Sequence, residues 1–518
     1  MPRRPDLAQL RRQAKELRDA ARAGEAAALN RFGSHVGSAD GQVELSLAQL
    51  VVAREHGFPS WARLKAAVGA DAAPDLASLV DDFLTASIDG RAQSAGRLLR
   101  ANPAIATYDI STAAVLGDLH GVQEHVRNDP TAAIRPDARR GWPPLLYACH
   151  SVWHRVTTEY SEGILQVVWL LLDTGADPNT NNGRPSRSGY RSALFGATGV
   201  ANNPAATSLL LRYGANPNDD ESLYHAAQHP DLACLRVLLG HGATVAGTNA
   251  FAAVIAPGNA EGVRLMLEAG GDPGRRVSAG RLADRTLAPL PLAVADCGVD
   301  VVAPLLAAGA DPNAVGADHR SVIRTAVRRG NQDVARLLRR YRAHDDTTEV
   351  DNFLGACVRA DRATVDQLLS VAPGLTRRLT AEDLGALADT AEYAQPAAVT
   401  FMLDLGFPIN ALRACDGATA LHAAAYAGRV SVVNVLLARG VDVNARDGQW
   451  GSTALAWATV GSGERPRYAR DADWVATVRT LLAAGSATDD AWIGGKPPSE
   501  EIAALLVASG IDEPDGDD

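Results

Sequence analysis

Short apolar segments at helical spacing alternate along this chain with single glycines. In residues 416–444, "DGATALHAAAYAGRVSVVNVLLARGVDVN", an alanine-rich segment ends at Gly428, and a second segment with its valines and leucines one helical turn apart ends at Gly440. Glycine adopts the left-handed conformation that closes a helix without the strain a side chain would cause. The pattern therefore predicts two short helices, over 418–428 and 430–440, each ended by a turn.

The end of this unit recurs along the chain. "LLARGVDVN" returns as "LLDTGADPN", "LLRYGANPN" and "LLAAGADPN", and weaker copies lie between and after these. The glycines of the copies are 28 to 45 residues apart, except for one long gap that holds two degenerate copies: Gly175, Gly214, Gly242, Gly270, Gly309, Gly406, Gly440 and Gly485. Because a pair of short helices cannot bury its apolar face alone, the copies are expected to stack on one another.

These residues resemble the ankyrin repeat. That family opens its repeat with Thr-Pro-Leu-His-x-Ala, which Thr419 to Ala424 match with Ala420 in place of proline, and closes it with Leu-Leu-x-x-Gly-Ala-Asp-x-Asn. The segments "GWPPLLYAC" and "GSTALAWAT" echo the opening. The resemblance implies an all-α, ankyrin-repeat solenoid of about twelve helix-turn-helix repeats. It also implies that His422 bonds to turn backbone and has a structural role.

The two ends of the chain differ from its middle. We expect an N-terminal helical module or cap over 1–74, the ankyrin array over 75–510 and an acidic tail over 511–518. The module is predicted to hold three helices, with an apolar stripe in the first and Ser60 as N-cap of the third; the stripe is Leu7, Leu10, Ala14 and Leu17. It resembles a small helical module that precedes ankyrin arrays in bacterial proteins, and we expect it to cap the first repeat.

Composition narrows the class of protein. The 518 residues carry a net charge of −10, which makes the molecule as a whole a poor candidate for coating nucleic acid. No run approaches the roughly 18 apolar residues that span a bilayer, and the charged N-terminus is not a secretory signal. The five cysteines are scattered, without metal-ligand or disulfide spacing. Nearly all basic residues are arginine, which suggests a bacterial genome rich in GC. We therefore expect a cytoplasmic monomer that has neither nucleic acid nor membrane as partner.

Two histidine pairs are the strongest candidates for chemistry. His150 and His154, and likewise His225 and His229, are four residues apart, so on a helix each pair could chelate a metal. Neither pair has the glutamate of a metalloprotease motif, and in the ankyrin register His150 and His225 fall on exposed parts of first helices. No nucleophile triad or phosphate loop is present. We predict a non-catalytic protein without cofactor; a small-molecule or metal site within 142–229 remains the alternative.

Aromatic residues are scarce, at 5%, yet they cluster around 142–169. Trp142, Tyr147 and Trp153 are predicted to take part in partner binding, since aromatic residues are enriched at the centre of interfaces. An insertion, "HRVTTEYSEG", lengthens this repeat, and insertions in repeat proteins emerge as loops. The alternative is that Trp142 and Trp169 fill a wider space between helices.

Two arginine-rich loops follow closing signatures. We call residues 179–191 and 272–285 the finger loops, because such turns edge the concave face of an ankyrin array. Their arginines are Arg184, Arg187, Arg191, Arg275, Arg276, Arg281 and Arg285. Guanidinium groups bind carboxylates in bidentate fashion. The sequence thus predicts a scaffold that binds an acidic protein partner through its concave face and finger loops.

The solenoid prediction is testable by truncation. Each unit of a solenoid contacts only its neighbours, so deleting residues 1–70 should expose the apolar face of the first repeat and leave the repeats after about residue 300 folded. Hydrogen exchange on the truncated chain measures this. A loss of protection spread evenly over all repeats would contradict a solenoid.

Overall fold

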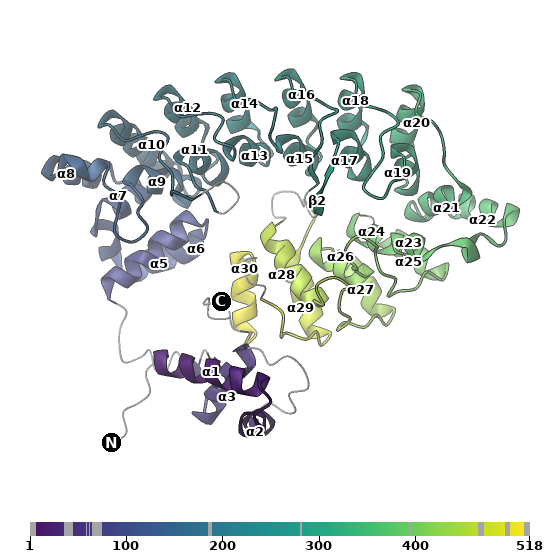
Figure 1. Cartoon of the computed structure of the whole chain (residues 1–518), viewed down its shortest axis with the longest axis horizontal. Coiled ribbons are helices and arrows are strands. Elements are labelled where there is room, and N and C mark those ends of the chain that lie inside the picture. Colours follow the sequence, from purple (N-terminus) through teal and green to yellow (C-terminus); the bar gives the residue numbers. More distant parts are fainter. Residues whose placement is uncertain are drawn as a thin grey trace. The chain divides into compact units, whose positions relative to one another are not determined.

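The structure is a computed structural model that describes residues 7–35, 45–58, 60–61, 63–64, 75–184, 189–279, 282–393, 395–464, 471–492 and 498–511. The chain forms two compact units (Figure 1). Unit 1 comprises Met1–Ser78 together with Ala503–Asp518, and unit 2 comprises Leu79–Ile502. In the described part of the chain, no helix is long and apolar enough to cross a membrane.

Unit 1 is a small bundle in which α1 (Leu7–Arg22), α2 (Ala26–His35) and α3 (Leu45–Glu55) pack on one another. The sequence predicts one helix over 6–32, but the chain breaks at Gly24, whose φ of +78° ends α1. The predicted stripe is confirmed for three of its residues, since Leu10, Ala14 and Leu17 are buried against α2 and α3. Ser60 caps as predicted, because its Oγ accepts a hydrogen bond from the amide of Arg63.

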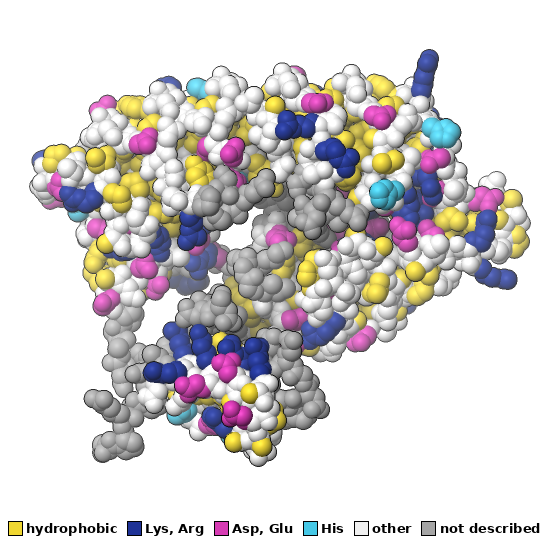
Figure 2. Space-filling model, in the orientation of Figure 1, with side chains coloured by type: hydrophobic (Ala, Val, Ile, Leu, Met, Phe, Trp, Pro, Cys, Tyr) yellow, Lys and Arg dark blue, Asp and Glu magenta, His cyan; other side chains and the backbone are white. Residues whose placement is uncertain are grey.

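The surface of unit 1 is basic over its first helix. Lys and Arg side chains gather over α1 in the face shown in Figure 2. Arg11, Lys15, Arg18 and Arg22 follow one another at helical spacing. Residues 1–70 hold 11 basic and 7 acidic residues, so the net negative charge of the chain lies in unit 2 and the tail.

Short helices joined by turns make up most of unit 2. The first half of the unit contains α5 (Leu76–Ile88), α6 (Ala92–Ala101), η1 (Pro103–Thr107), α7 (Ile110–Leu116), α8 (Leu119–Asn128), η2 (Pro130–Ala133), α9 (Pro144–Cys149), η3 (Val152–Arg155), α10 (Thr158–Asp173), α11 (Ala193–Phe195), η4 (Gly196–Val200), α12 (Pro204–Arg212), α13 (Ser222–Ala227), α14 (Ala233–Gly240), α15 (Ala250–Ile255) and α16 (Ala260–Glu268). The second half contains α17 (Pro289–Asp296), α18 (Val299–Ala307), α19 (Val322–Arg328), α20 (Gln332–Arg340), α21 (Glu349–Val358), α22 (Arg362–Val371), η5 (Leu375–Arg378), α23 (Ala381–Leu384), α24 (Ala386–Tyr393), α25 (Pro396–Asp404), α26 (Ala420–Tyr426), α27 (Val430–Ala438), α28 (Ala454–Glu464) and α29 (Trp474–Ala483). The last helix, α30 (Glu500–Ala508), begins in unit 2 and ends in unit 1.

The helices pair and the pairs stack, as the repeats predict. Within a unit of the repeat, α26 packs on α27 and α19 on α20; between units, α24, α26 and α28 form one row and α25, α27 and α29 a second row. The same two rows are visible from α7 to α20 (Figure 1). One apolar cluster reaches from Val80 to Leu338. The degenerate copies within the long gap are thus helix pairs like the others.

The glycines that define the repeat have the conformation predicted for them. All eight closing glycines have φ between +77° and +98°. After the glycine, Asp177 Oδ1 accepts a hydrogen bond from the amide of Asn179 at 2.9 Å, and Asp311 and Asp442 do the same for Asn313 and Asn444. The closing signature therefore encodes a turn that is fixed by its own side chains.

The asparagine of the closing signature joins one unit to the next. Asn179 donates from Nδ2 to the carbonyl oxygen of Gly214 at 3.0 Å and accepts from the amide of Asn216 at 2.8 Å. In the other strong copies the asparagine Oδ1 accepts from the following unit, at 2.6–2.8 Å, through the amides of Thr244, His344 and Ala487. In these four copies the closing turn is thus bonded to the turn of the unit that follows it.

The opening signature confirms the structural role predicted for His422. This side chain is buried, and its Nε2 donates to the carbonyl oxygen of Ser452, in the next turn, at 3.0 Å. Its Nδ1 lies 2.7 Å from Oγ1 of Thr419, which caps α26. The histidine therefore ties the start of one unit to the backbone of the next.

The fold departs from the all-α prediction in the second finger loop. Val277–Ala279 (β1) and Leu282–Leu287 (β2) form an antiparallel two-stranded sheet, in which Val277 pairs with Leu287 and Ser278 with Thr286. The insertion predicted as a loop after residue 154 is also different. Thr157 caps α10, and most of the insertion forms its first turns. Both segments satisfy their backbone groups within secondary structure instead of leaving them to solvent.

Close approach of neighbouring first helices gives a stability prediction. A methyl group on Gly355 of α21 would lie 2.0 Å from the carbonyl oxygen of Val327 in α19, so Gly355→Ala should force the two helices apart and cost about 1–3 kcal/mol. Gly240→Ala is the matched control, because a methyl group there meets nothing within 4 Å and alanine favours a helix. Urea unfolding of both variants measures the difference. Equal stability of the two would show that α19 and α21 are not in close backbone contact.

Candidate functional site

Backbone hydrogen bonds fix the base of the first finger loop, and a hollow lies beside it. Asn181 and Ser192 form an isolated β-bridge, and the amide of Asn182 donates to the carbonyl oxygen of Arg191 at 3.0 Å. Arg184 is exposed, beyond the bridge; Arg187 lies outside the described residues. The hollow, ≈ 380 Å³ in volume, is lined by Pro178, Asn179, Asn181, Tyr190, Ser192, Leu194, Asn216 and Asp219.

Arg191 is used inside the molecule. Its Nη2 lies 2.8 Å from Asp89 Oδ1, and its Nη1 donates to the carbonyl oxygen of Ile88 at 3.2 Å. The guanidinium also lies over the ring of Trp142, 5.9 Å from its centre. Arg191 thus anchors the finger to the end of α5, so it contributes less to an open basic rim than the sequence suggested.

The second finger loop offers one clearly open arginine. Arg275 and Arg276 are both exposed. Arg276 donates from Nε to Thr286 Oγ1 at 3.2 Å, and from Nη2 to the carbonyl oxygen of the same residue, across the small sheet. Arg281 lies outside the described residues; Arg285 belongs to β2, but its side chain is outside the description. Among described residues, neither Arg184 nor Arg275 has a carboxylate partner within ion-pair distance.

The predicted aromatic residues lie together, but in the core. Trp142, Tyr147 and Trp153 are at most 5% exposed. Tyr147 donates from its hydroxyl to Asp137 Oδ2 at 2.7 Å, and Trp153 from Nε1 to Ser87 Oγ at 3.1 Å. Trp142 therefore fills space between helices, as the alternative held, whereas Trp169 is 49% exposed on α10. Trp142 of this cluster lies under the guanidinium of Arg191 and so helps to hold the first finger loop in place.

The first histidine pair is placed differently from the prediction. Helix α9 ends at Cys149 and His154 lies in η3, so the two side chains do not share a helix face. His150 was predicted to be exposed, and this is wrong: it is fully buried, with Nδ1 donating to the carbonyl oxygen of Leu146 at 3.0 Å. His154 Nδ1 accepts from Asn203 Nδ2 at 3.1 Å. Both rings are packed components of the repeat.

The histidines of the second pair, His225 and His229, do not lie on one helix either. Helix α13 ends at Ala227, and His229 Nε2 donates to the carbonyl oxygen of Gly199 at 3.0 Å. His225 is partly exposed and lies 3.4 Å from Glu221 Oε2. Within the described ranges, no group of three or more His, Cys, Asp or Glu side chains is placed to hold a metal ion. Four of the five cysteines are buried; Cys415 is exposed.

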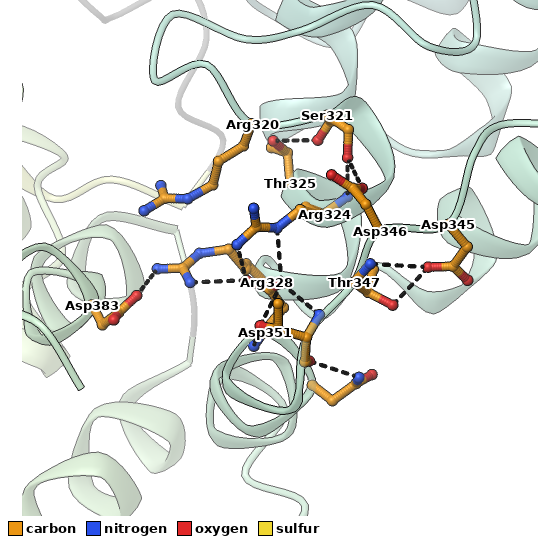
Figure 3. Close-up of polar contacts among 12 residues, drawn as sticks. Arg320, Ser321, Arg324, Thr325, Arg328, Asp345, Asp346, Thr347, Asp351 and Asp383 are labelled. Carbon is orange, nitrogen blue, oxygen red and sulfur yellow. Dashed lines mark hydrogen bonds and ion pairs between the residues drawn. The ribbon is translucent and has the colours of Figure 1, made fainter. Parts of the chain in front are cut away.

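A buried ion-pair network, which we call the arginine joint, connects α19, α21 and α23 (Figure 3). Asp351 has no exposed surface and accepts from Arg324 Nε at 2.9 Å and from Arg328 Nη1 at 3.0 Å. Arg328 continues to Asp383 Oδ1 at 2.7 Å. Burial opposes the charge on Asp351, but hydrogen bonds from Arg324, Thr348 and Arg328 outweigh it and hold its pKa below the usual value.

Only part of the arginine joint is visible in the sequence. Arg324 and Arg328 are four residues apart in "SVIRTAVRRG" and so share a helix face. Their partners come 27 and 55 residues later, in two degenerate repeats. The joint neutralises these arginines within the chain, so it is a structural contact between successive repeats of unit 2. The finger loops remain the candidate binding surface.

Buried neutral histidines predict a loss of stability in mild acid. Burial lowers the pKa of His150 to about 3 and that of His154 to about 4, below the ordinary 6.5. Between pH 6.5 and 4 the unfolded chain binds protons that the folded chain does not, so stability is full above pH 6.5 and falls as the pH decreases. At pH 5 each histidine should cost about 2 kcal/mol relative to pH 7.5.

Urea unfolding at the two pH values measures this effect. The His150→Gln variant cannot take up that proton, so its stability difference between pH 7.5 and 5 should be smaller than the parent's by about 2 kcal/mol. An unchanged difference in the variant would show that His150 is not a neutral buried group.

A comparison with known protein families matches one segment of this chain. Residues 416–448, which contain α26, α27 and their closing turn, match the ankyrin repeat family. The crystal structure of the human ASB11 ankyrin repeat domain is 19% identical, with a TM-score of 0.22, and the match covers 45% of this chain and 96% of that domain.

A curated relative from rice, Oryza sativa subsp. japonica, is a probable E3 ubiquitin-protein ligase, XBOS31. It is 29% identical over 146 residues, which make up 27% of this chain and 29% of the ligase. The chain therefore matches less than a third of that relative. The match to the ankyrin repeat family falls on the opening and closing signatures from which the resemblance is predicted.

Proposed function

We propose that this protein is a scaffold without catalytic activity of its own, which holds a partner protein on the finger loops and concave face of an ankyrin array. Ankyrin repeats generally mediate protein–protein interaction. The segment 416–448 that matches the ankyrin repeat shares its helix pairing and closing glycine with the copies before it, and its bridging asparagine with three of them, which supports an array of about twelve repeats. The helices of unit 1 are proposed to cap this array.

Two exposed arginines without an ion pair in the described part of the chain carry the proposal. Arg184 and Arg275 project from finger loops whose bases are fixed by a β-bridge and by a two-stranded sheet. Of the other arginines that the structure describes in unit 2, many lie beside carboxylates of the same chain, as in the arginine joint. Guanidinium groups that have no ion pair of their own are able to bind carboxylates in bidentate fashion. An acidic protein partner is the chemistry that fits them.

The hollow beside the first finger adds a place for the partner's side chains. Asn179, Asn181 and Asn216 line it with Tyr190. Its lining is mainly polar, which suits a partner's polar or amide side chain better than an apolar one. The competing proposal, a metal or small-molecule site within 142–229, has less support because Trp142, Trp153, His150 and His154 are packed against the chain itself.

The proposal extends to binding only. The rice relative is a probable ligase, but the similar region is 29% of its length, so ligase activity is not carried over. We further propose a cytoplasmic, monomeric protein of bacterial origin, with neither nucleic acid nor membrane as its target.

The test compares two variants of equal charge. Arg184→Ser combined with Arg275→Ser removes the open arginines, whereas Arg127→Ser combined with Arg212→Ser removes two exposed arginines from the ends of second helices. Arg276 is left in place because it bridges β1 and β2. The partner is the protein captured by the immobilised parent from a lysate of the source cells, purified for binding measurements.

We expect the finger variant to bind this partner about 5- to 30-fold more weakly than the parent, for about 0.5–1 kcal/mol per rim charge. Affinity of the parent should also fall as salt is raised. The helix-end variant should bind like the parent. Equal weakening by both variants would mean that net charge alone, not the finger loops, governs the association.

A further inference from the structure

Two large apolar side chains stand exposed on adjacent turns near the end of unit 2. Leu412 is 51% exposed and Trp450 55% exposed. Their turns are joined by a backbone hydrogen bond of 2.9 Å from Gly448 to Gly417. A methyl group on Gly448 would lie 3.9 Å from Leu412 Cδ1, so the leucine overlies the turn that carries Trp450. We call these two side chains and the turn between them the Trp450 patch.

Trp450 is held in place by the chain around it. Asp447 is buried, and its carboxylate accepts from the amides of Gln449, Trp450 and Ser452 at 2.6–2.9 Å. It also accepts from Trp457 Nε1 at 3.0 Å, and the rings of Trp450 and Trp457 are 5.4 Å apart. An indole that is exposed yet already ordered loses little entropy on binding, which is typical of residues that dominate interface energies.

The exposed charges on the Trp450 side of the patch are mainly negative. Arg446, four residues before Trp450, is shared by Asp489 and Asp490, at 2.7 and 3.4 Å. Next to Leu412, Arg413 is shared by Asp389, Glu392 and Asp416, at 2.6–3.3 Å, but this group is largely buried and Asp389 is also shared by Arg329. Around Arg446 the carboxylates outnumber the guanidinium, and Asp489 is 65% exposed. A cation approaching the open face of Trp450 is therefore favoured by the ring and by the carboxylates beside it.

We propose that the Trp450 patch binds a short linear segment of a second partner protein, with a lysine or arginine stacked on the indole of Trp450 and an aliphatic side chain on Leu412. Apolar contact supplies affinity on Leu412, and the carboxylates select a basic segment over an acidic one. This surface prefers a charge opposite to that preferred by the finger loops. The scaffold thereby holds two partners of unlike charge at separate places on one array.

The experiment selects peptides from a random dodecapeptide phage library on the full-length parent protein, followed by depletion on the Trp450→Ser variant. Enriched peptides are synthesised, and their dissociation constants are measured by fluorescence anisotropy. Trp169→Ser is the matched control, because Trp169 is 49% exposed on α10, away from these turns. Circular dichroism melting checks that each variant is folded.

We expect enriched peptides to carry Lys or Arg next to an aliphatic residue. Trp450→Ser should weaken their binding at least 10-fold, Leu412→Ser 3- to 10-fold, and Trp169→Ser less than 2-fold. Peptides that are acidic, or that bind Trp450→Ser as well as the parent, would overturn the proposal, as would a selection that yields no peptide dependent on Trp450. None of these results bears on the arginines of the finger loops, so the two proposals fail independently.

Discussion

The structure depends on the close approach of each helix pair to the next. A pair of short helices buries its apolar face only against a neighbouring pair. The row of first helices, to which α19, α21 and α26 belong, must therefore bring backbones almost into contact. Glycine and alanine make this possible, as where Gly355 faces the carbonyl oxygen of Val327 and where α26 is built from alanines. The bridging asparagines and His422 then fix the register of turns that stacking has brought together.

The repeat itself could be predicted from sequence because its determinants are local. A closing glycine needs a left-handed φ whatever surrounds it, and the Asp-x-Asn turn bonds to atoms two residues away. The same reasoning failed for His150, because its burial depends on the ring of Phe195 and on Gly196, which a different unit supplies. Arg191 was assigned to an open rim for a similar reason. Its partner Asp89 lies 102 residues earlier, and no short window of sequence contains both.

The arginine joint shows that successive repeats are not held together by the same kind of interaction throughout. From Val80 to Leu338 one continuous apolar cluster links successive units. Between α19, α21 and α23, buried carboxylates and guanidinium groups take part in the contact as well. Removing one member of such a network leaves a buried charge without its partner, which is more damaging than removing a methyl group from an apolar contact. Sequence drift in these degenerate repeats is therefore constrained by charge pairing and not by side-chain volume alone.

The bridging asparagines have a consequence for how such a chain can change in length. Asn179 recognises the next unit by the carbonyl oxygen of Gly214 and the amide of Asn216, and Asn444 recognises Ala487 by its amide. These are main-chain groups that almost any residue supplies. A unit can thus be duplicated, deleted or exchanged while both new junctions keep their hydrogen bonds, provided that the closing turn is intact. The hydrogen bonds at such a junction are the same whichever repeat follows. The repeats can therefore differ freely only in the residues that project from the array.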